Sequence, residues 1–271
     1  MAAVALVALV AGLWVLWSSP STSASGASSS APARQSPADS SAARALRVDV
    51  IREFPHSRTA YTQGLLWRDG WLYESTGQYG RSRLSRIDPA TGEVAQEVPI
   101  PSIFFGEGLA VVGNELFMLT YHAERAFVYD ITSFEPDRMY RYQGEGWGLC
   151  HDGSRLVMSN GSDRLTFRDP TTFEETGSVP VTLRDDPQRQ INELECVGEV
   201  VYANIYQDDY IVIIDPVTGV VTHTIDASGL LTPDEAQGVD VLNGIAHDPT
   251  TDTFYITGKL WPKMFEVRFV E

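Results

Sequence analysis

Five short segments that begin with a polar or aromatic residue and mostly continue with Gly and Leu recur through the chain. They are QGL at 63, EGL at 107, WGL at 147, NEL at 192 and NGI at 243, and successive starts are 40 to 51 residues apart. Side chains at equivalent positions of successive repeats surround one axis. A ring of carboxyl, amide and indole groups could hold a polar molecule and move its protons. The candidate ring is Gln63, Glu107, Trp147, Asn192 and Asn243.

A second ring comes from the end of the next apolar run in each repeat. Its members are Gly77, Tyr121, Gly161, Tyr206 and Lys259. The start of a strand and the end of its antiparallel neighbour lie at the same edge of a sheet. Both rings are therefore predicted to face one mouth of a central channel. The tyrosines are candidate substrate-binding residues there, with packing in the core as the alternative.

Glu107 and Lys259 are the two charged members of these rings. Glu107 lies between FFG and GLA, where burial among apolar neighbours would raise the pKa of its carboxyl. Lys259 and Lys263 are the only lysines, both in TGKLWPK, while other basic positions use Arg. This scarcity favours a role for a compact ammonium. The alternative for the polar ring members is a structural role at strand ends.

The segments between the rings predict β-strands. LYEST, LFMLT, LVMSN, VYANI and FYITG are short runs rich in aromatic and β-branched residues, with no competing helical pattern. Four repeats then end a third strand in Asp, as in IDPATG and IDPVTG, which is turn chemistry. The repeat length suits a four-stranded unit. We predict an all-β fold, a five-bladed β-propeller closed by an N-terminal strand, RVDVIREF from Arg47.

The N-terminal part of the chain differs from the rest in composition. Residues 2–17 form an uncharged apolar run, so 1–17 is predicted to be a signal peptide or an uncleaved signal anchor. Residues 18–45 are dominated by Ser, Ala and Pro and are predicted to be a disordered linker. The propeller would occupy 46–271. We expect an exported protein, periplasmic or secreted, with a membrane anchor if the leader is not cleaved.

Composition excludes several classes of function. A formal net charge of -16 argues against nucleic acid as a partner. Cys150 and Cys196 could pair in an oxidising compartment, which the sequence does not decide. The two cysteines and five histidines lack metal-ligand spacing, so no metal and no cofactor are expected. With 43% hydrophobic residues, 271 residues can bury a core without a partner, and we expect a monomer.

Specific motifs add a resemblance to a known family. They are YTQGL at 61, YESTGQYGRSRL at 73, FGEGLA at 105, GEGWGL at 144, INELE at 191, YANI at 202, LNGIA at 242 and TGKLWPK at 257. From about Phe54 to the C-terminus the chain resembles the plant and bacterial type of glutaminyl-peptide cyclotransferase. The resemblance implies an aminoacyltransferase that converts the N-terminal glutamine of peptides and proteins into pyroglutamate and releases ammonia. It also implies a channel site, which would comprise Gln63, Glu107, Trp147, Asn192 and Lys259 with the aromatic Tyr61 and Tyr206.

This reaction needs no enzyme nucleophile, because the substrate's own α-amine attacks its side-chain amide. A carboxyl group with a modestly tuned pKa could take the amine proton and pass it to the leaving ammonia, and Glu107 fits this role. Lys259, Asn192, Gln63 and the indole N–H of Trp147 are candidate donors to the oxyanion. The predicted substrate-binding residues are Tyr61, Tyr206, Tyr121 and Asn243.

Two other functions are compatible with parts of the pattern. A noncatalytic propeller that binds a peptide or another ligand would keep the aromatic residues and could lose Glu107 without penalty. A metal-dependent, lactonase-like propeller would need several carboxylates or amides around a cation, but six blades would be expected and five starts are visible.

Overall fold

The computed structural model describes residues 43–271. All the regular secondary-structure elements in this range are β-strands. Four consecutive strands form each of three antiparallel sheets. The first sheet is β2 (Thr62–Arg68), β3 (Trp71–Thr76), β4 (Arg83–Ile87) and β5 (Val94–Pro99). The second is β6 (Gly106–Val112), β7 (Glu115–Thr120), β8 (Arg125–Asp130) and β9 (Pro136–Arg141). The third is β10 (Leu149–His151), β11 (Leu156–Met158), β12 (Arg164–Arg168) and β13 (Glu175–Pro180).

The remaining large sheet contains two groups of four strands. One group is β16 (Ile191–Val197), β17 (Val200–Ile205), β18 (Tyr210–Ile214) and β19 (Val221–Asp226). The other is β20 (Leu242–Asp248), β21 (Thr253–Gly258), β22 (Lys263–Val270) and the N-terminal strand β1 (Arg44–Pro55). A small hairpin, β14 (Thr182–Leu183) and β15 (Asp186–Pro187), lies between β13 and β16 in the chain.

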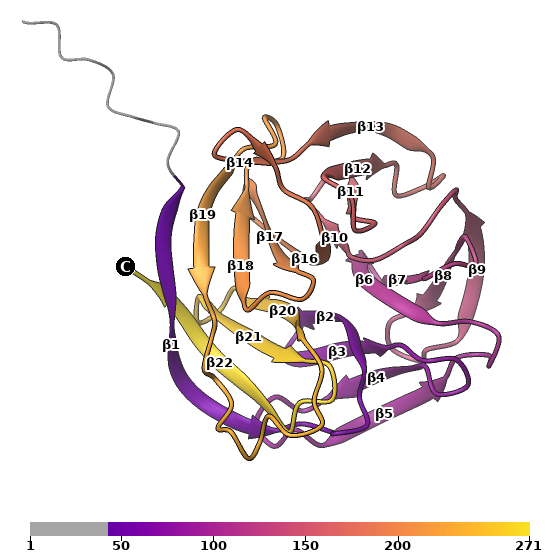
Figure 1. Ribbon diagram of the computed structural model, residues 1–271. Helices are drawn as coiled ribbons and strands as arrows, with labels where there is room; N and C mark the ends of the chain where they lie inside the picture. The colour runs from indigo at the N-terminus through magenta and orange to yellow at the C-terminus, as the bar shows by residue number, and fades with distance from the viewer. Residues whose placement is uncertain (1–42) are drawn as a thin grey trace, which may run out of the picture. The chain divides into compact units, whose positions relative to one another are not determined.

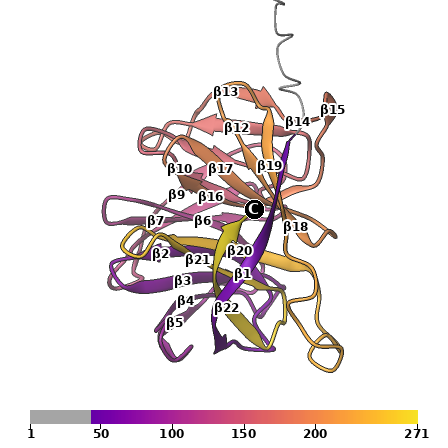
Figure 2. The ribbon, with the colours of Figure 1, turned by 90° about the vertical axis from the view of Figure 1, so that its left-hand side faces the viewer.

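β1 completes the last group and joins it to the group before. It pairs antiparallel with β22 over most of its length, as predicted, and its first residues, Arg44–Arg47, pair parallel with β19. Figure 2 shows β1 running along β22 toward β19. The strand thus begins at Arg44, inside the predicted 18–45 linker, because the parallel pairing with β19 satisfies its backbone groups. The predicted leader and the rest of the linker lie outside the described residues.

The first strand of each group lies nearest the centre (Figure 1). β2 contacts β6, β6 contacts β10, β10 contacts β16, β16 contacts β20, and β20 contacts β2. The inner strands therefore form a closed ring, and each sequence repeat supplies one group. An all-β, propeller-like fold closed by an N-terminal strand is confirmed.

Apolar faces of neighbouring sheets pack against each other to form the core. Leu72, Leu116, Leu156 and Val201, equivalent residues of the second strands, are all fully buried. Burying each such side chain contributes about 1.5–3 kcal/mol. Polar turns end the third strands, where Asp88, Asp130, Asp169 and Asp215 each accept an N–H two residues further on. The predicted Asp turns are thereby confirmed.

A disulfide connects two of the inner strands. Cys150 in β10 is bonded to Cys196 in β16, with Cα atoms 5.5 Å apart. The structure thereby answers the question of pairing that the sequence leaves open. Between residues 43 and 271 no helix is long and apolar enough to cross a membrane.

Candidate active site

Irregular pairing at the start of the inner strands turns the ring side chains toward the centre. The register with the second strand shifts between Thr62 and Gly64, and the corresponding shifts occur in β6, β16 and β20. A bulge leaves one residue unpaired and redirects its side chain. Gln63, Glu107 and Asn192 lie inside these shifts, which explains how polar groups that begin buried strands face one cavity.

The glycines that follow Gln63, Glu107 and Trp147 have a packing cause. A Cβ on Gly64 would lie 2.6 Å from the backbone N of Leu109, and one on Gly148 would lie 2.1 Å from the carbonyl O of Asn192. At these positions one inner segment touches the next through a residue that has no side chain. The recurrent Gly is required by the close approach of the inner strands.

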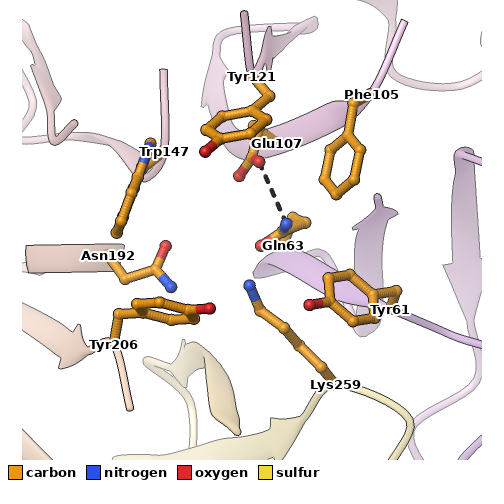
Figure 3. Close-up of a pocket in the computed structure, with 9 residues that line it drawn as sticks. All are labelled: Tyr61, Gln63, Phe105, Glu107, Tyr121, Trp147, Asn192, Tyr206 and Lys259. Carbon is orange, nitrogen blue, oxygen red and sulfur yellow. Dashed lines mark hydrogen bonds between the residues drawn. The ribbon is translucent and has the colours of Figure 1, made fainter. Parts of the chain in front are cut away.

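Nine residues from all five groups line a cavity of about 250 Å³ at one end of the ring of inner strands (Figure 3). They are Tyr61, Gln63, Phe105, Glu107, Tyr121, Trp147, Asn192, Tyr206 and Lys259. The cavity combines one carboxyl, one ammonium and two amides with aromatic walls. None of the lining residues is Ser, Thr, Cys or His, the side chains that most often act as nucleophiles in acyl transfer.

Glu107 is the buried acid of the cavity, with 3% of its surface exposed. Its Oε1 accepts a hydrogen bond from Nε2 of Gln63 at 3.1 Å, and its carbonyl accepts one from the hydroxyl of Ser75. Burial raises the pKa of the Glu107 carboxyl well above its usual range; nearby Lys259 opposes the shift and Glu145 adds to it. A carboxyl with a raised pKa suits proton transfer near neutral pH.

Lys259 is the buried basic residue of the cavity, with 4% of its surface exposed. Its Nζ lies 5.0 Å from the ring centre of Tyr61 and 5.5 Å from that of Tyr206. Burial lowers the pKa of Lys259, while the charges of Glu107 and Asp240 oppose that shift. The ammonium points into the cavity (Figure 3), where it can meet a developing negative charge.

Aromatic rings form the walls. Phe105 packs edge-on against Tyr61 with centroids 6.2 Å apart, and Trp147 packs edge-on against Tyr206 at 5.6 Å. The Tyr61 hydroxyl donates to Oδ2 of Asp240 at 2.7 Å, which fixes the ring beside Lys259. These rigid walls can exclude water from the apolar part of a bound molecule.

Comparison with known proteins agrees with this geometry. A family model described as glutamine cyclotransferase matches residues 21–269. The chain belongs to the glutamine cyclotransferase family. A glutaminyl-peptide cyclotransferase from Arabidopsis thaliana is 37% identical over 226 residues, which are 82% of this chain and 71% of that protein. The crystal structure of Myxococcus xanthus glutaminyl cyclase matches with a TM-score of 0.77 and 39% identity, covering 84% of this chain and 98% of that one.

Eight of the nine residues that the sequence predicts for a site of this family line the cavity. Asn243 is the exception. It is fully buried, and its Nδ2 donates to the carbonyl of Thr62 at 3.0 Å and lies 3.5 Å from Oε1 of Gln63. The structure does not place Asn243 in the cavity, because its bulged strand turns the amide toward β2, where it supports Gln63.

Trp147 lines the cavity in a different manner from the one predicted. Its indole N–H donates to Oε2 of Glu145 at 2.9 Å, so it is not free to face an oxyanion. The ring lies against Gly161, whose Cβ would come within 2.6 Å of it. Trp147 therefore contributes a flat wall to the family's cavity.

Two residues near the cavity were missed from the sequence. Phe105 lines it, and Glu145 holds Trp147 and influences the pKa of Glu107. Both stand two residues before a ring residue, the position that Tyr61 has in the first repeat. The repeat alignment therefore contained the signal, although the prediction considered only the ring positions themselves.

Proposed function

We propose that the protein cyclises the N-terminal glutamine of peptides and proteins in this cavity, with Glu107 as the proton-transfer group. The observation that carries the proposal is a buried carboxyl and a buried ammonium that face one cavity lined by no Ser, Thr, Cys or His, in a chain of this family. Intramolecular attack by the substrate's α-amine needs only those groups. A noncatalytic binding propeller would not need to bury either charge.

The proton balance assigns Glu107 two successive tasks. The neutral α-amine forms a bond to the side-chain amide carbon, and the resulting ammonium gives one proton to the Glu107 carboxylate. Glu107 then protonates the amide nitrogen, the bond from carbon to that nitrogen breaks, and ammonia leaves. The carbonyl re-forms and the five-membered lactam is complete. The carboxylate is regenerated, so no other reactant is consumed.

Lys259 and Asn192 are assigned to the oxyanion of the tetrahedral intermediate. Both side chains point into the cavity beside Gln63, as Figure 3 shows. One such donor typically supplies about 2.7–4 kcal/mol of transition-state stabilisation. Gln63 donates to Glu107 and therefore orients the carboxyl, with its carbonyl oxygen supported by Asn243.

The aromatic walls are assigned to substrate binding. Tyr61, Tyr121, Tyr206 and the face of Trp147 surround the cavity from four sides. They can hold the glutamine side chain folded back on its amine, the geometry that ring closure requires. The rest of the peptide would leave through the mouth, so only the first residue must fit.

We further propose that the protein acts after export, in the periplasm or outside the cell, and as a monomer. The apolar run at 2–17 supports export, and the Cys150–Cys196 disulfide suits an oxidising compartment. Cell fractionation with N-terminal sequencing tests export and distinguishes a cleaved signal peptide from an uncleaved membrane anchor. A shortened soluble protein would indicate a signal peptide, an intact membrane-bound one would indicate an anchor, and a cytoplasmic one would contradict export.

The activity is tested by incubating the full chain with a peptide that begins with glutamine. We expect release of one ammonia per peptide and loss of the free amine. The same peptide with an acetylated N-terminus is the matched control, because it keeps the amide but has no nucleophilic amine. Binding of the free peptide without ammonia release would contradict the proposal and favour the noncatalytic alternative.

A further inference from the structure

A buried pair of titratable side chains, His56 and Glu74, lies outside the cavity. Their side chains are 3% and 4% exposed, and Nε2 of His56 is 2.9 Å from Oε1 of Glu74. His56 directly follows β1, and Glu74 belongs to β3. No step of the proposed reaction uses either residue, and a buried charged pair is seldom retained for stability alone.

The partners of His56 define where its protons lie. Nδ1 is 2.9 Å from the carbonyl O of Trp261 and 3.3 Å from Oγ1 of Thr257. The Thr257 hydroxyl donates to the carbonyl of Lys263, so toward His56 it can only accept. Nδ1 therefore carries a hydrogen and donates it to Trp261, and a second proton lies between Nε2 and Glu74. Burial lowers the pKa of His56, but the charge and hydrogen bond of Glu74 outweigh it and the net shift is upward.

Trp261 closes the turn that begins with Lys259. Leu260, between them, has a φ of 63°, in the left-handed region that a side chain disfavours. Two backbone hydrogen bonds hold the turn. The N–H of Leu260 donates to the carbonyl of Ala60 at 2.7 Å, and the N–H of His56 donates to the carbonyl of Pro262 at 2.9 Å. A strained turn persists only where its surroundings hold it. The imidazole of His56 supplies one of those supports.

Glu74 extends the same network to the strand that carries Gln63. Its Oε1 also accepts the hydroxyl of Thr62 at 2.6 Å. Thr62 directly precedes Gln63, at the bulge that turns the Gln63 amide toward Glu107. One buried pair thus contacts both segments, the turn after Lys259 and the strand before Gln63.

We propose that His56 and Glu74 are positioning residues that fix the Lys259 turn against the strand of Gln63 and so aim the ammonium into the cavity. The inference rests on the proposed role of Lys259. Loss of the His56–Glu74 pair would leave the other cavity residues in place but let the Lys259 turn relax, because Leu260 would escape its left-handed conformation.

Two substitutions of His56 separate its two contacts. The amide nitrogen of Asn reaches about as far as Nδ1, and that of Gln about as far as Nε2. His56→Asn can keep the bond to Trp261, whereas His56→Gln keeps only the bond to Glu74. We expect His56→Gln to lower kcat by up to about 100-fold, the effect of a misplacement of about 1 Å, with KM changed much less. His56→Asn, which keeps the bond to the turn and loses the bond to Glu74, should lower kcat less than His56→Gln does.

The two lysines of the chain allow a readout that does not depend on activity. A protein labelled with 15N-lysine gives two backbone amide signals, from Lys259 and Lys263, and Lys263→Arg identifies them. We expect His56→Gln to shift or broaden the Lys259 signal, and His56→Asn to change it less. Far-ultraviolet circular dichroism and the thermal midpoint establish that each variant is folded.

Equal effects of the two variants on kcat, or an unchanged Lys259 signal in a folded His56→Gln protein, would overturn the positioning role. If His56→Gln does not fold, Glu74→Ala replaces it. This variant removes the acceptor shared by His56 and Thr62, and an unchanged Lys259 signal and kcat in the folded variant would again contradict the proposal. Absence of cyclisation in the unaltered protein would instead reject the proposed function. The lysine signals would still test the positioning role of His56 and Glu74.

Discussion

Nε2 of Gln63 donates to Oε1 of Glu107 at 3.1 Å, so the first repeat orients the acid of the second. The bond occupies one carboxyl oxygen from the side of β2. Oε2 has no hydrogen-bond partner among residues 43–271 and is left to exchange a proton with substrate. Gln63 therefore orients Glu107, the residue that we propose transfers the proton.

Replacement of Lys259 tests the need for a compact ammonium. Lys259→Arg should be nearly as damaging to kcat as Lys259→Ala, because a guanidinium is longer and spreads its charge over a planar fork. It therefore does not reproduce the compact ammonium whose Nζ lies 5.0 Å and 5.5 Å from the ring centres of Tyr61 and Tyr206. Steady-state kinetics on both variants measure the effect. Lys263→Arg is the matched control and should keep full activity, since its ion pairs with Glu53 and Glu235 tolerate Arg. An active Lys259→Arg protein would show that any positive charge suffices.

The pH dependence of the rate tests the environment of Glu107. Its carboxylate form accepts the proton, and its pKa is raised, so activity should be lost on acidification at a pH well above 4.5. Glu145→Gln removes a charge that contributes to that shift and can still accept the Trp147 N–H. It should move the acidic limb of kcat/KM to lower pH.

Glu199→Gln makes the same change of charge in the exposed hairpin between β16 and β17, and it should leave the profile unchanged. An acidic limb that is the same in the Glu145→Gln and unaltered proteins would show that another group controls it.

Gly161→Ala tests Trp147 as a wall. A Cβ at Gly161 would lie 2.6 Å from the indole ring, so the ring must move, and KM should rise more than kcat falls. Gly229→Ala is the control for backbone strain. Gly229 has a φ of 71°, against 78° for Gly161, but nothing lies within 4 Å of its Cβ position. Both variants should lose about 1–2 kcal/mol of stability, and a KM that rises equally in both would contradict the wall.

The disulfide is expected to stabilise the fold. It joins residues 46 positions apart. Such crosslinks typically contribute about 2–4 kcal/mol to the free energy of unfolding, and we expect a contribution of this size here. Replacing both cysteines by Ala should lower the free energy of unfolding in urea by this amount. Dithiothreitol should destabilise the unaltered protein and leave the double variant unaffected. Identical urea midpoints of the two proteins would contradict a stabilising role.

The sequence predicted most of the site because repetition places equivalent residues around one axis. Glu107 and Lys259 could be found this way without knowledge of any side-chain direction. Asn243 could not, because its orientation depends on the bulge in β20 and on Gly244, whose φ is 117°. Nor could the direction of the Trp147 indole, which depends on a hydrogen bond to Glu145.

The fold was predicted in class but not in every pairing. Short runs rich in aromatic and β-branched residues identified the second strand of each repeat, and Asp turns identified the end of the third strand in four repeats, because local patterns determine these features. The parallel pairing of Arg44–Arg47 with β19 was missed, since the stretch before Arg47 has no strand pattern of its own. The contacts of His56 were missed because they join two different groups of strands. Glu74 belongs to β3 of the first sheet, whereas Trp261, 205 positions after His56, lies between β21 and β22.

The most direct test of the account is Glu107→Gln, which keeps the volume and hydrogen bonding of the side chain and removes its proton transfer. Turnover of a Gln-initiated peptide, peptide affinity and the thermal midpoint are measured on the same preparation. We predict a fall in kcat of at least about 100-fold, with folding and peptide binding retained. A folded Glu107→Gln protein that cyclises the peptide within a few-fold of the unaltered rate would contradict the mechanism, and the donors around the cavity would then have to account for catalysis.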